Sequence, residues 1–129
     1  MSDQIKHECG IALIRLLQPL QHYQEKYGTA LHGLYTMQLL LQKMRNRGQD
    51  GAGVATIKLD PSPGTRYISR KRSNSPQYLK EVFQGIFQHF EDCTPEQLKA
   101  GEWLKENKPY TGEVLMGHLR YGTHGDNSI

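Results

Sequence analysis

Cys9 stands close to the start of the chain and directly before an apolar run, where a thiol could act as a nucleophile. A cysteine thiolate can attack a carbonyl carbon and split one difficult reaction into two easier steps through a covalent intermediate. A lone cysteine before a strand is more often a small buried hydrophobic residue, however, since free cysteine is among the most buried residue types. Position alone therefore leaves both roles open for Cys9, and Cys93 is the weaker of the two candidates.

A dense set of hydrogen-bond donors follows the apolar run near the end of the chain. The segment 117–125 combines the guanidinium of Arg120, the hydroxyl of Thr123, the imidazole of His124 and the backbone amides of flexible glycine positions. A guanidinium offers a planar pair of N–H donors that matches a carboxylate. The segment therefore predicts a site for an anion or a carboxylate at the end of a strand.

A third candidate segment is rich in glycine and begins at Arg47 and Gly48. It follows a predicted helix instead of a strand, and it lacks the Gly-Lys-Ser/Thr of a phosphate-binding loop, so neither common nucleotide-binding fingerprint applies. Cations followed by a glycine are also typical of the end of a helix. Taken alone, the segment is interpreted as a helix stop and a turn, and the sequence pairs its Asp50 with no second carboxylate across a site.

Alternating strand and helix patterns must position these segments, and they predict a mixed α and β fold. With 129 residues, 36% of them hydrophobic and 22% charged, the chain suits one folded domain at most. The apolar run 10–17 is expected to be a strand buried on both faces, and residues 29–45 place their apolar side chains on one helical stripe. The other expected elements are strands at 53–59, 65–69 and 113–119, and two amphipathic helices between 73 and 107, the second starting at a capping box over 94–97.

Charge, cysteine count and hydropathy exclude several classes of protein. The formal net charge of +3 is too small to indicate binding to nucleic acid or membranes, and the basic run 70–72 is interpreted as a solvated connection. The two cysteines lack Cys-x-x-Cys spacing and fit neither a disulfide framework nor a zinc site, so no metal site is expected. No stretch has the length of a membrane-spanning helix, and the start lacks an apolar signal core, which predicts a cytoplasmic protein.

Taken together, the three segments resemble the glutamine amidotransferases whose nucleophile is an N-terminal cysteine (class II). The resemblance depends on Cys-Gly-Ile-Ala at 9–12, Asn-Arg-Gly-Gln-Asp-Gly-Ala-Gly at 46–53, and Gly-His-Leu-Arg-Tyr-Gly-Thr-His-Gly at 117–125. Each block alone is weak evidence, whereas three blocks in this order are strong evidence. Together they bracket nearly the whole chain. The family has the four-layered αββα sandwich of the N-terminal-nucleophile hydrolases, so the resemblance implies an α+β fold of that type.

The resemblance implies hydrolysis of the side-chain amide of L-glutamine through a thioester on Cys9, with delivery of the released ammonia to a second domain. The base would be the α-amino group of Cys9 itself, whose ordinary pKa of about 7.7 to 8.0 allows it to accept the thiol proton near neutral pH. That amino group is free only after residues 1–8 are removed. Residues 1–8 are therefore expected to be a leader, and 9–129 the front part of the glutaminase domain.

The resemblance also implies roles for the other two segments. The residues that would bind glutamine are Arg120, Thr123 and His124. Arg120 would hold the α-carboxylate of the substrate through its planar pair of donors. The loop that would orient the nucleophile comprises Arg47, Gly48 and Asp50, with Asp50 holding the loop in shape. No cofactor is expected within 9–129.

Within the family, Arg-Gly-Gln-Asp at 47–50 most resembles the amidophosphoribosyltransferases. This implies delivery of ammonia to phosphoribosyl pyrophosphate in purine synthesis. The partner would be a downstream synthase domain of the same polypeptide. Mg²⁺ would bind only in that domain, and the full-length enzyme would be a homo-oligomer. Thr-His-Gly at 123–125 is closer to the glucosamine-phosphate synthases, which keeps a sugar phosphate acceptor as an alternative.

The expected sandwich is incomplete in this chain. The family's oxyanion hole is an Asn-Gly pair on a later strand, and Asn127-Ser128 is not that pair. Loss of one oxyanion donor lowers turnover roughly 100-fold to 1000-fold, so residues 9–129 alone are expected to be inactive. A truncated domain that binds a partner or glutamine without catalysis is therefore a further alternative.

Overall fold

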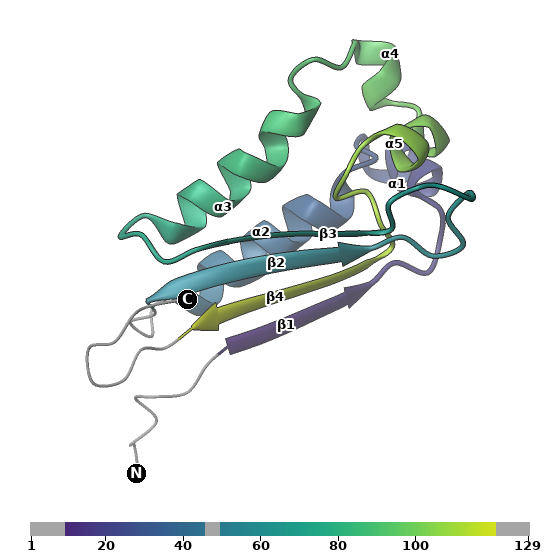
Figure 1. The fold of residues 1–129 in the computed structure, drawn as a ribbon. Coiled ribbons are helices and arrows are strands. Elements are labelled where there is room, and N and C mark those ends of the chain that lie inside the picture. Colours follow the sequence, from purple (N-terminus) through teal and green to yellow (C-terminus); the bar gives the residue numbers. More distant parts are fainter. Residues whose placement is uncertain (1–9, 46–49, 121–129) are drawn as a thin grey trace.

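One antiparallel sheet forms the centre of the protein in the computed structural model, which describes residues 10–45 and 50–120 (Figure 1). The strands are β1 Gly10–Arg15, β2 Gly51–Ile57, β3 Ile68–Ser73 and β4 Val114–Arg120. Their order in the sheet is β1-β4-β2-β3, and each neighbouring pair is antiparallel. Within the described residues, β1 and β3 are therefore the two edge strands.

Helices cover one face of this sheet. They are α1 Leu20–Tyr27, α2 His32–Met44, α3 Tyr78–Phe87, α4 Pro95–Leu98 and α5 Gly101–Asn107, with a short 3₁₀ helix, η2, at Gln88–Phe90. α2 packs on β1 and β4, and α3 packs on β2 and β3, while α1, α4 and α5 gather near the end of the sheet where β1 finishes (Figure 1). The α+β class expected from the sequence is confirmed. None of the helices in the described ranges is long and apolar enough to cross a membrane.

The core lies between the covered face of the sheet and the helices α2 and α3. Leu115 and Leu119 of β4 belong to the same buried cluster as Met37 and Leu41 of α2. Gly117 lies between the two leucines on β4, and a Cβ atom there would be 2.6 Å from the Met37 sulfur. Helix α2 can approach the sheet this closely because position 117 has no side chain.

The helix boundaries predicted from local sequence signals agree with the structure in some places and not in others. The predicted capping box is confirmed, since the Thr94 hydroxyl accepts a hydrogen bond from the Gln97 amide at 3.1 Å and the Gln97 side chain accepts one from the Thr94 amide at 2.9 Å. Helix α2 begins at His32 and not at residue 29, because the Thr29 hydroxyl accepts from the Leu31 amide in a turn that precedes the helix. The sequence predicted no helix at α1, whose polar composition includes a single buried residue, Leu20.

The predicted hairpin between β2 and β3 is confirmed, but its second strand is displaced along the chain. β3 begins at Ile68 and not at residue 65, after a turn in which Asp60 and Gly64 have positive φ angles. The basic run 70–72 lies within β3, so its interpretation as a connection between elements was wrong. Its side chains are exposed, which is typical of charges that protect an edge strand from pairing with another chain.

The other face of the sheet, called here the open face, carries exposed apolar side chains. Ile11 and Leu13 of β1 are 74% and 65% exposed, and Met116 of β4 is 47% exposed. The expectation that the first strand is buried on both faces is therefore not met by the described residues. Ala12 points into the core while its neighbours point toward the face that no helix of the described ranges covers, which explains the difference.

A buried charged cluster closes the end of the sheet where β2 finishes. The Lys105 ammonium lies 2.7 Å from the Glu113 carboxylate, and the same carboxylate accepts a hydrogen bond from the Leu59 amide at 2.9 Å. Lys58, which is also buried, donates to the Lys105 carbonyl. Burial lowers the pKa of Lys58 because removal from water disfavours its charged form. The cluster ties the β2–β3 turn to α5.

Candidate functional site

Three parts of the chain meet at the opposite end of the sheet from this charged cluster. The first residue of β1, Gly10, pairs with Leu119 near the end of β4. The first residue of β2, Gly51, pairs with Arg120, the last residue of β4. The Asp50 amide donates a hydrogen bond to the Arg120 carbonyl at 2.6 Å. The start of β1, the start of β2 and the end of β4 are therefore adjacent, which is a consequence of the antiparallel register.

Most of the residues that the sequence singled out belong to the chain just beyond these three points. Those that lie outside the described residues are Cys9, Arg47, Gly48, Thr123 and His124. Each is within four residues along the chain of Gly10, Asp50 or Arg120. The structure thus brings together the described neighbours of all three motifs, and Asp50 and Arg120 are the two candidates that it describes directly.

Arg120 ends β4 on the side of the open face. Side chains alternate along a strand, and Leu115 and Leu119 point into the core while Met116 and His118 are exposed. By this alternation Arg120 shares the open face with Met116 and His118, and its side chain is half-buried. Its cross-strand neighbour is Gly51, where a Cβ atom would lie 3.0 Å from the Ser73 carbonyl oxygen, so the chain after β3 passes close to this end of the sheet.

His118 is a residue of this face to which sequence reasoning assigned no role. It pairs with Ile11 on one side and Gly53 on the other. A Cβ atom on Gly53 would lie 2.5 Å from the His118 Nε2, so the imidazole lies over the backbone of Gly53. Partial removal of the imidazole from water and the charge of Arg72 lower the pKa of His118 below its ordinary value of 6.5, which favours a neutral imidazole at pH 7. The two-residue spacing to Arg120 was the signal that could have indicated a shared face.

A hollow of about 480 Å³ lies on the open face beside His118. Its floor includes the small residues Gly53 and Ala55 of β2. The exposed cations Arg70 and Arg72 of β3 line one side, and apolar side chains from β1 and β4 line the other. Such a surface can hold a group that is partly apolar and partly anionic.

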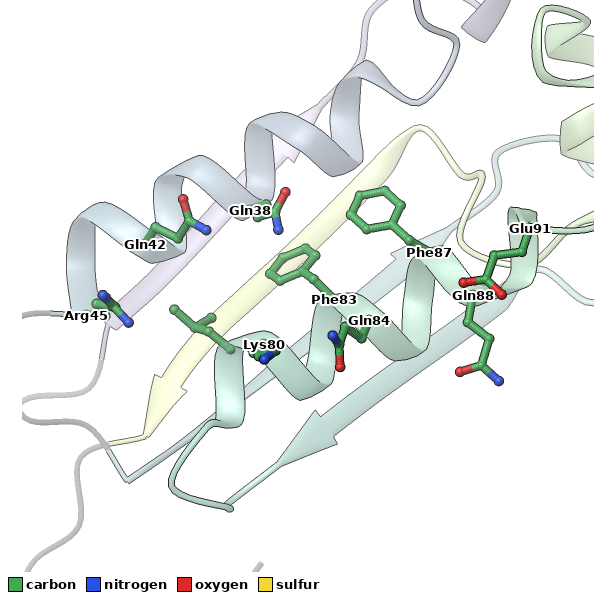
Figure 2. Close-up of a pocket in the computed structure, with 10 residues that line it drawn as sticks. Gln38, Gln42, Arg45, Lys80, Phe83, Gln84, Phe87, Gln88 and Glu91 are labelled. Atoms are coloured by element: carbon green, nitrogen blue, oxygen red, sulfur yellow. The ribbon is translucent and has the colours of Figure 1, made fainter. Parts of the chain in front are cut away.

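A larger groove lies on the helical side of the molecule, between α2 and α3 (Figure 2). It has a volume of about 870 Å³ and is separated from the open face by the sheet. Its lining contains neither cysteine nor histidine, and its charged residues are Arg45, Lys80 and Glu91. The groove therefore offers no thiol–imidazole pair for covalent catalysis through a cysteine.

The second cysteine, Cys93, contributes to the packing of the protein. Cys93 is half-buried and packs against the hydrophobic core, as its weaker rank among the candidates suggested. Within the ranges 10–45 and 50–120, no three histidine, cysteine, aspartate or glutamate side chains lie close enough to hold a metal ion. Comparison of the chain with protein-family models, curated proteins and solved structures found no match. The residues of the chain and their arrangement are therefore the basis for its proposed function.

Proposed function

We propose that this chain is the glutaminase part of a glutamine amidotransferase with an N-terminal cysteine nucleophile. The observation that supports the proposal is the meeting of three chain segments at one end of the sheet. Gly10 follows Cys9, Asp50 follows the Arg-Gly-Gln loop, and Arg120 precedes the Thr-His-Gly turn. The described neighbours of three motifs far apart in the sequence are therefore adjacent, as a site shared by the three motifs would require.

In the proposed reaction the thiol of Cys9 gives its proton to the α-amino group of the same residue. The thiolate attacks the side-chain carbonyl carbon of glutamine, the C–N bond breaks, and the departing nitrogen takes the proton to leave as ammonia. Water then hydrolyses the thioester, which releases glutamate and restores the thiol. The amino group can act as the base only when residues 1–8 have been removed, since a peptide bond to Glu8 would occupy its nitrogen.

The substrate would be held by the residues at the end of β4. Arg120 would bind the α-carboxylate of glutamine, and Thr123 and His124 would donate further hydrogen bonds. The hydrogen bond from the Asp50 amide to the Arg120 carbonyl supports this assignment, because it joins the substrate-binding strand to the loop proposed to orient the nucleophile. That loop comprises Arg47, Gly48 and Asp50.

The open face supports the more specific fold, the four-layered αββα sandwich. A sheet with helices on one face and exposed apolar side chains on the other is one half of such a sandwich. A second sheet, itself covered by helices, would pack on Ile11, Leu13 and Met116. That second half would also carry the Asn-Gly pair expected to form the oxyanion hole.

Phosphoribosyl pyrophosphate is the proposed acceptor of the ammonia, on the basis of Arg-Gly-Gln-Asp at 47–50. The synthase domain that binds it, with its Mg²⁺, would belong to the same polypeptide. Thr-His-Gly at 123–125 favours a sugar phosphate acceptor as the second candidate. A third candidate, a domain that binds without catalysis, would share the arrangement of the sheet but not the reactivity of Cys9.

Covalent labelling tests the nucleophile directly. The protein that contains this chain, processed to begin at Cys9, would be treated with a diazoketone analogue of glutamine and analysed by intact mass. We expect one adduct per chain, lost in Cys9→Ser and retained in the matched variant Cys93→Ser. Labelling that persists in Cys9→Ser, or an active enzyme that retains Met1, would contradict the proposal. Absence of any adduct on processed protein would favour the non-catalytic alternative.

A further inference from the structure

The groove between α2 and α3 has an apolar floor and polar walls. Leu79, Phe83 and Phe87 of α3 form part of its lining (Figure 2). Tyr35 of α2 is exposed, and its ring stacks on that of Phe87 with the centroids 4.9 Å apart. Exposed aromatic surface of this kind is enriched at the centres of protein interfaces. The groove is therefore suited to a macromolecular partner.

The walls of the groove are lined by glutamine. Gln38 and Gln42 face it from α2, and Gln84 and Gln88 face it from the side of α3. Each pair is spaced four residues apart, so its two members share one face of the helical path. An amide side chain both donates and accepts hydrogen bonds, and so each glutamine can pair with another glutamine on a partner.

The charges of the groove are separated between its two ends. The two helices run antiparallel, so Arg45 at the end of α2 and Lys80 at the start of α3 lie at one end, and Glu91 lies at the other (Figure 2). A helical path from Lys80 to Glu91 spans roughly 16 Å at 1.5 Å per residue. None of these three side chains takes part in the ion pairs found among the described residues, which join Lys105 to Glu113 and Lys108 to Asp92.

We propose that this groove binds the α3 helix of a second copy of the chain about a two-fold axis. In such an interface each contact between two different residues occurs twice, because the same patch serves both subunits. An antiparallel pair of α3 helices would place Lys80 against the partner's Glu91 and Gln84 against the partner's Gln88. The charge at each end would then meet its opposite, and the amides would meet amides.

The two-fold arrangement uses the same groove on both copies. If the partner's α3 rests between α2 and α3, symmetry places the first copy's α3 between the two helices of the partner. The aromatic pair of Tyr35 and Phe87 would lie under the partner's helix and supply the apolar centre. Charge complementarity is the observation that selects a second copy, since the charges along the path from Lys80 on α3 to Glu91 just after η2 are complementary to themselves when reversed.

Charge-reversal variants at Lys80 and Glu91 test the proposal. Sedimentation over a range of protein concentrations measures how strongly each variant forms dimers. Glu91→Lys would oppose Lys80 to a lysine, and Lys80→Glu would oppose Glu91 to a glutamate. We expect either change alone to weaken dimer formation by about tenfold, from two like-charge contacts per dimer. An equal mixture of the two variants should recover dimers as heterodimers, because each contact then joins opposite charges.

Two controls separate this surface from others. Glu102→Lys on α5 makes the same change in net charge at an exposed position outside the groove and should leave association unchanged. Leu13→Lys alters the open face, and loss of dimers in this variant with no effect of Glu91→Lys would overturn the proposal. A monomer at every concentration, or a mixture that does not recover dimers, would also overturn it. Circular dichroism would establish that each variant is folded, and failure would leave the proposed chemistry of Cys9 untouched.

Discussion

The absence of a side chain at Gly53 decides how His118 lies on the sheet. With any other residue at this position, the Cβ atom and the imidazole would occupy the same space. The sequence placed His118 inside a motif rich in donors, but it could not show that the ring lies over the facing strand. This arrangement also brings the imidazole under the influence of Arg72, which lowers its pKa further.

His118 is expected to titrate below pH 6.5, and Arg72→Gln should raise its pKa toward that value because a nearby positive charge disfavours the imidazolium. A group with a lowered pKa binds fewer protons in the folded state than in the unfolded state. Its contribution to stability is therefore present above pH 6.5 and is lost as the pH falls through the folded-state pKa. Titration of the imidazole by NMR measures the pKa of His118 in the parent protein and in Arg72→Gln.

Arg70→Gln is the matched control for this titration. Arg70 lines the same hollow on the same strand, but its charge is not among the causes of the shift at His118. The pKa of His118 should therefore change little in this variant. Equal shifts in Arg70→Gln and Arg72→Gln would show that general positive charge, and not the placement of Arg72, controls the imidazole.

At the scale of elements, the two ends of the sheet are held in different ways. At one end the starts of β1 and β2 and the end of β4 are joined mainly by backbone pairing. At the other end the buried side chains of Lys58 and Glu113, with the half-buried Lys105, fix the β2–β3 turn against α5. The end joined by this backbone pairing is the one proposed to bind substrate.

Glu113→Ala should destabilise the protein by about 3 kcal/mol, because it leaves Lys105 without its buried ion-pair partner and the Leu59 amide without its acceptor. Denaturant-induced unfolding measures this loss. Asp92→Asn removes the other ion pair, with Lys108, in which the aspartate is exposed to water. Little change in stability is expected there, and a loss equal to that of Glu113→Ala would show that burial is not the reason.

The elements with strong local signals were predicted well, and those without them were not. The capping box, the helical stripe of α2 and the β2–β3 hairpin each follow from residues that are neighbours in the sequence. The path of α1 was not predicted because its single buried residue, Leu20, produces no apolar periodicity. Strand β1 is buried on a single face, and which face is buried depends on the elements that pack against it. No local sequence pattern contains that information.

At the scale of the whole molecule, the open face gives the described chain an apolar surface that no described element covers. Ile11, Leu13 and Met116 lie side by side on β1 and β4, and their register places Leu13 directly opposite Met116. Contiguous apolar surface of this kind marks a site of interaction with other protein. In the proposed sandwich it would contact a second sheet.

A solvatochromic hydrophobic dye should bind the 129-residue chain and fluoresce strongly, and the double variant Leu13→Lys with Met116→Lys should lose most of that signal. The physical reason is the removal of contiguous apolar area from one face. Leu17→Lys is the control, since Leu17 is 77% exposed but lies beyond the end of β1. Equal losses in the control and the double variant would argue against a patch on the sheet.

The sequence by itself determined the α+β class, most of the elements and the three segments that could carry chemistry, because these depend on residue type and on spacing over a few positions. Only the tertiary structure decided that Gly10, Asp50 and Arg120 meet at one end of the sheet, since strand order and register join residues far apart in the chain. It also decided that one sheet face is covered and the other is open. Packing between distant elements sets both features, and no local pattern encodes it.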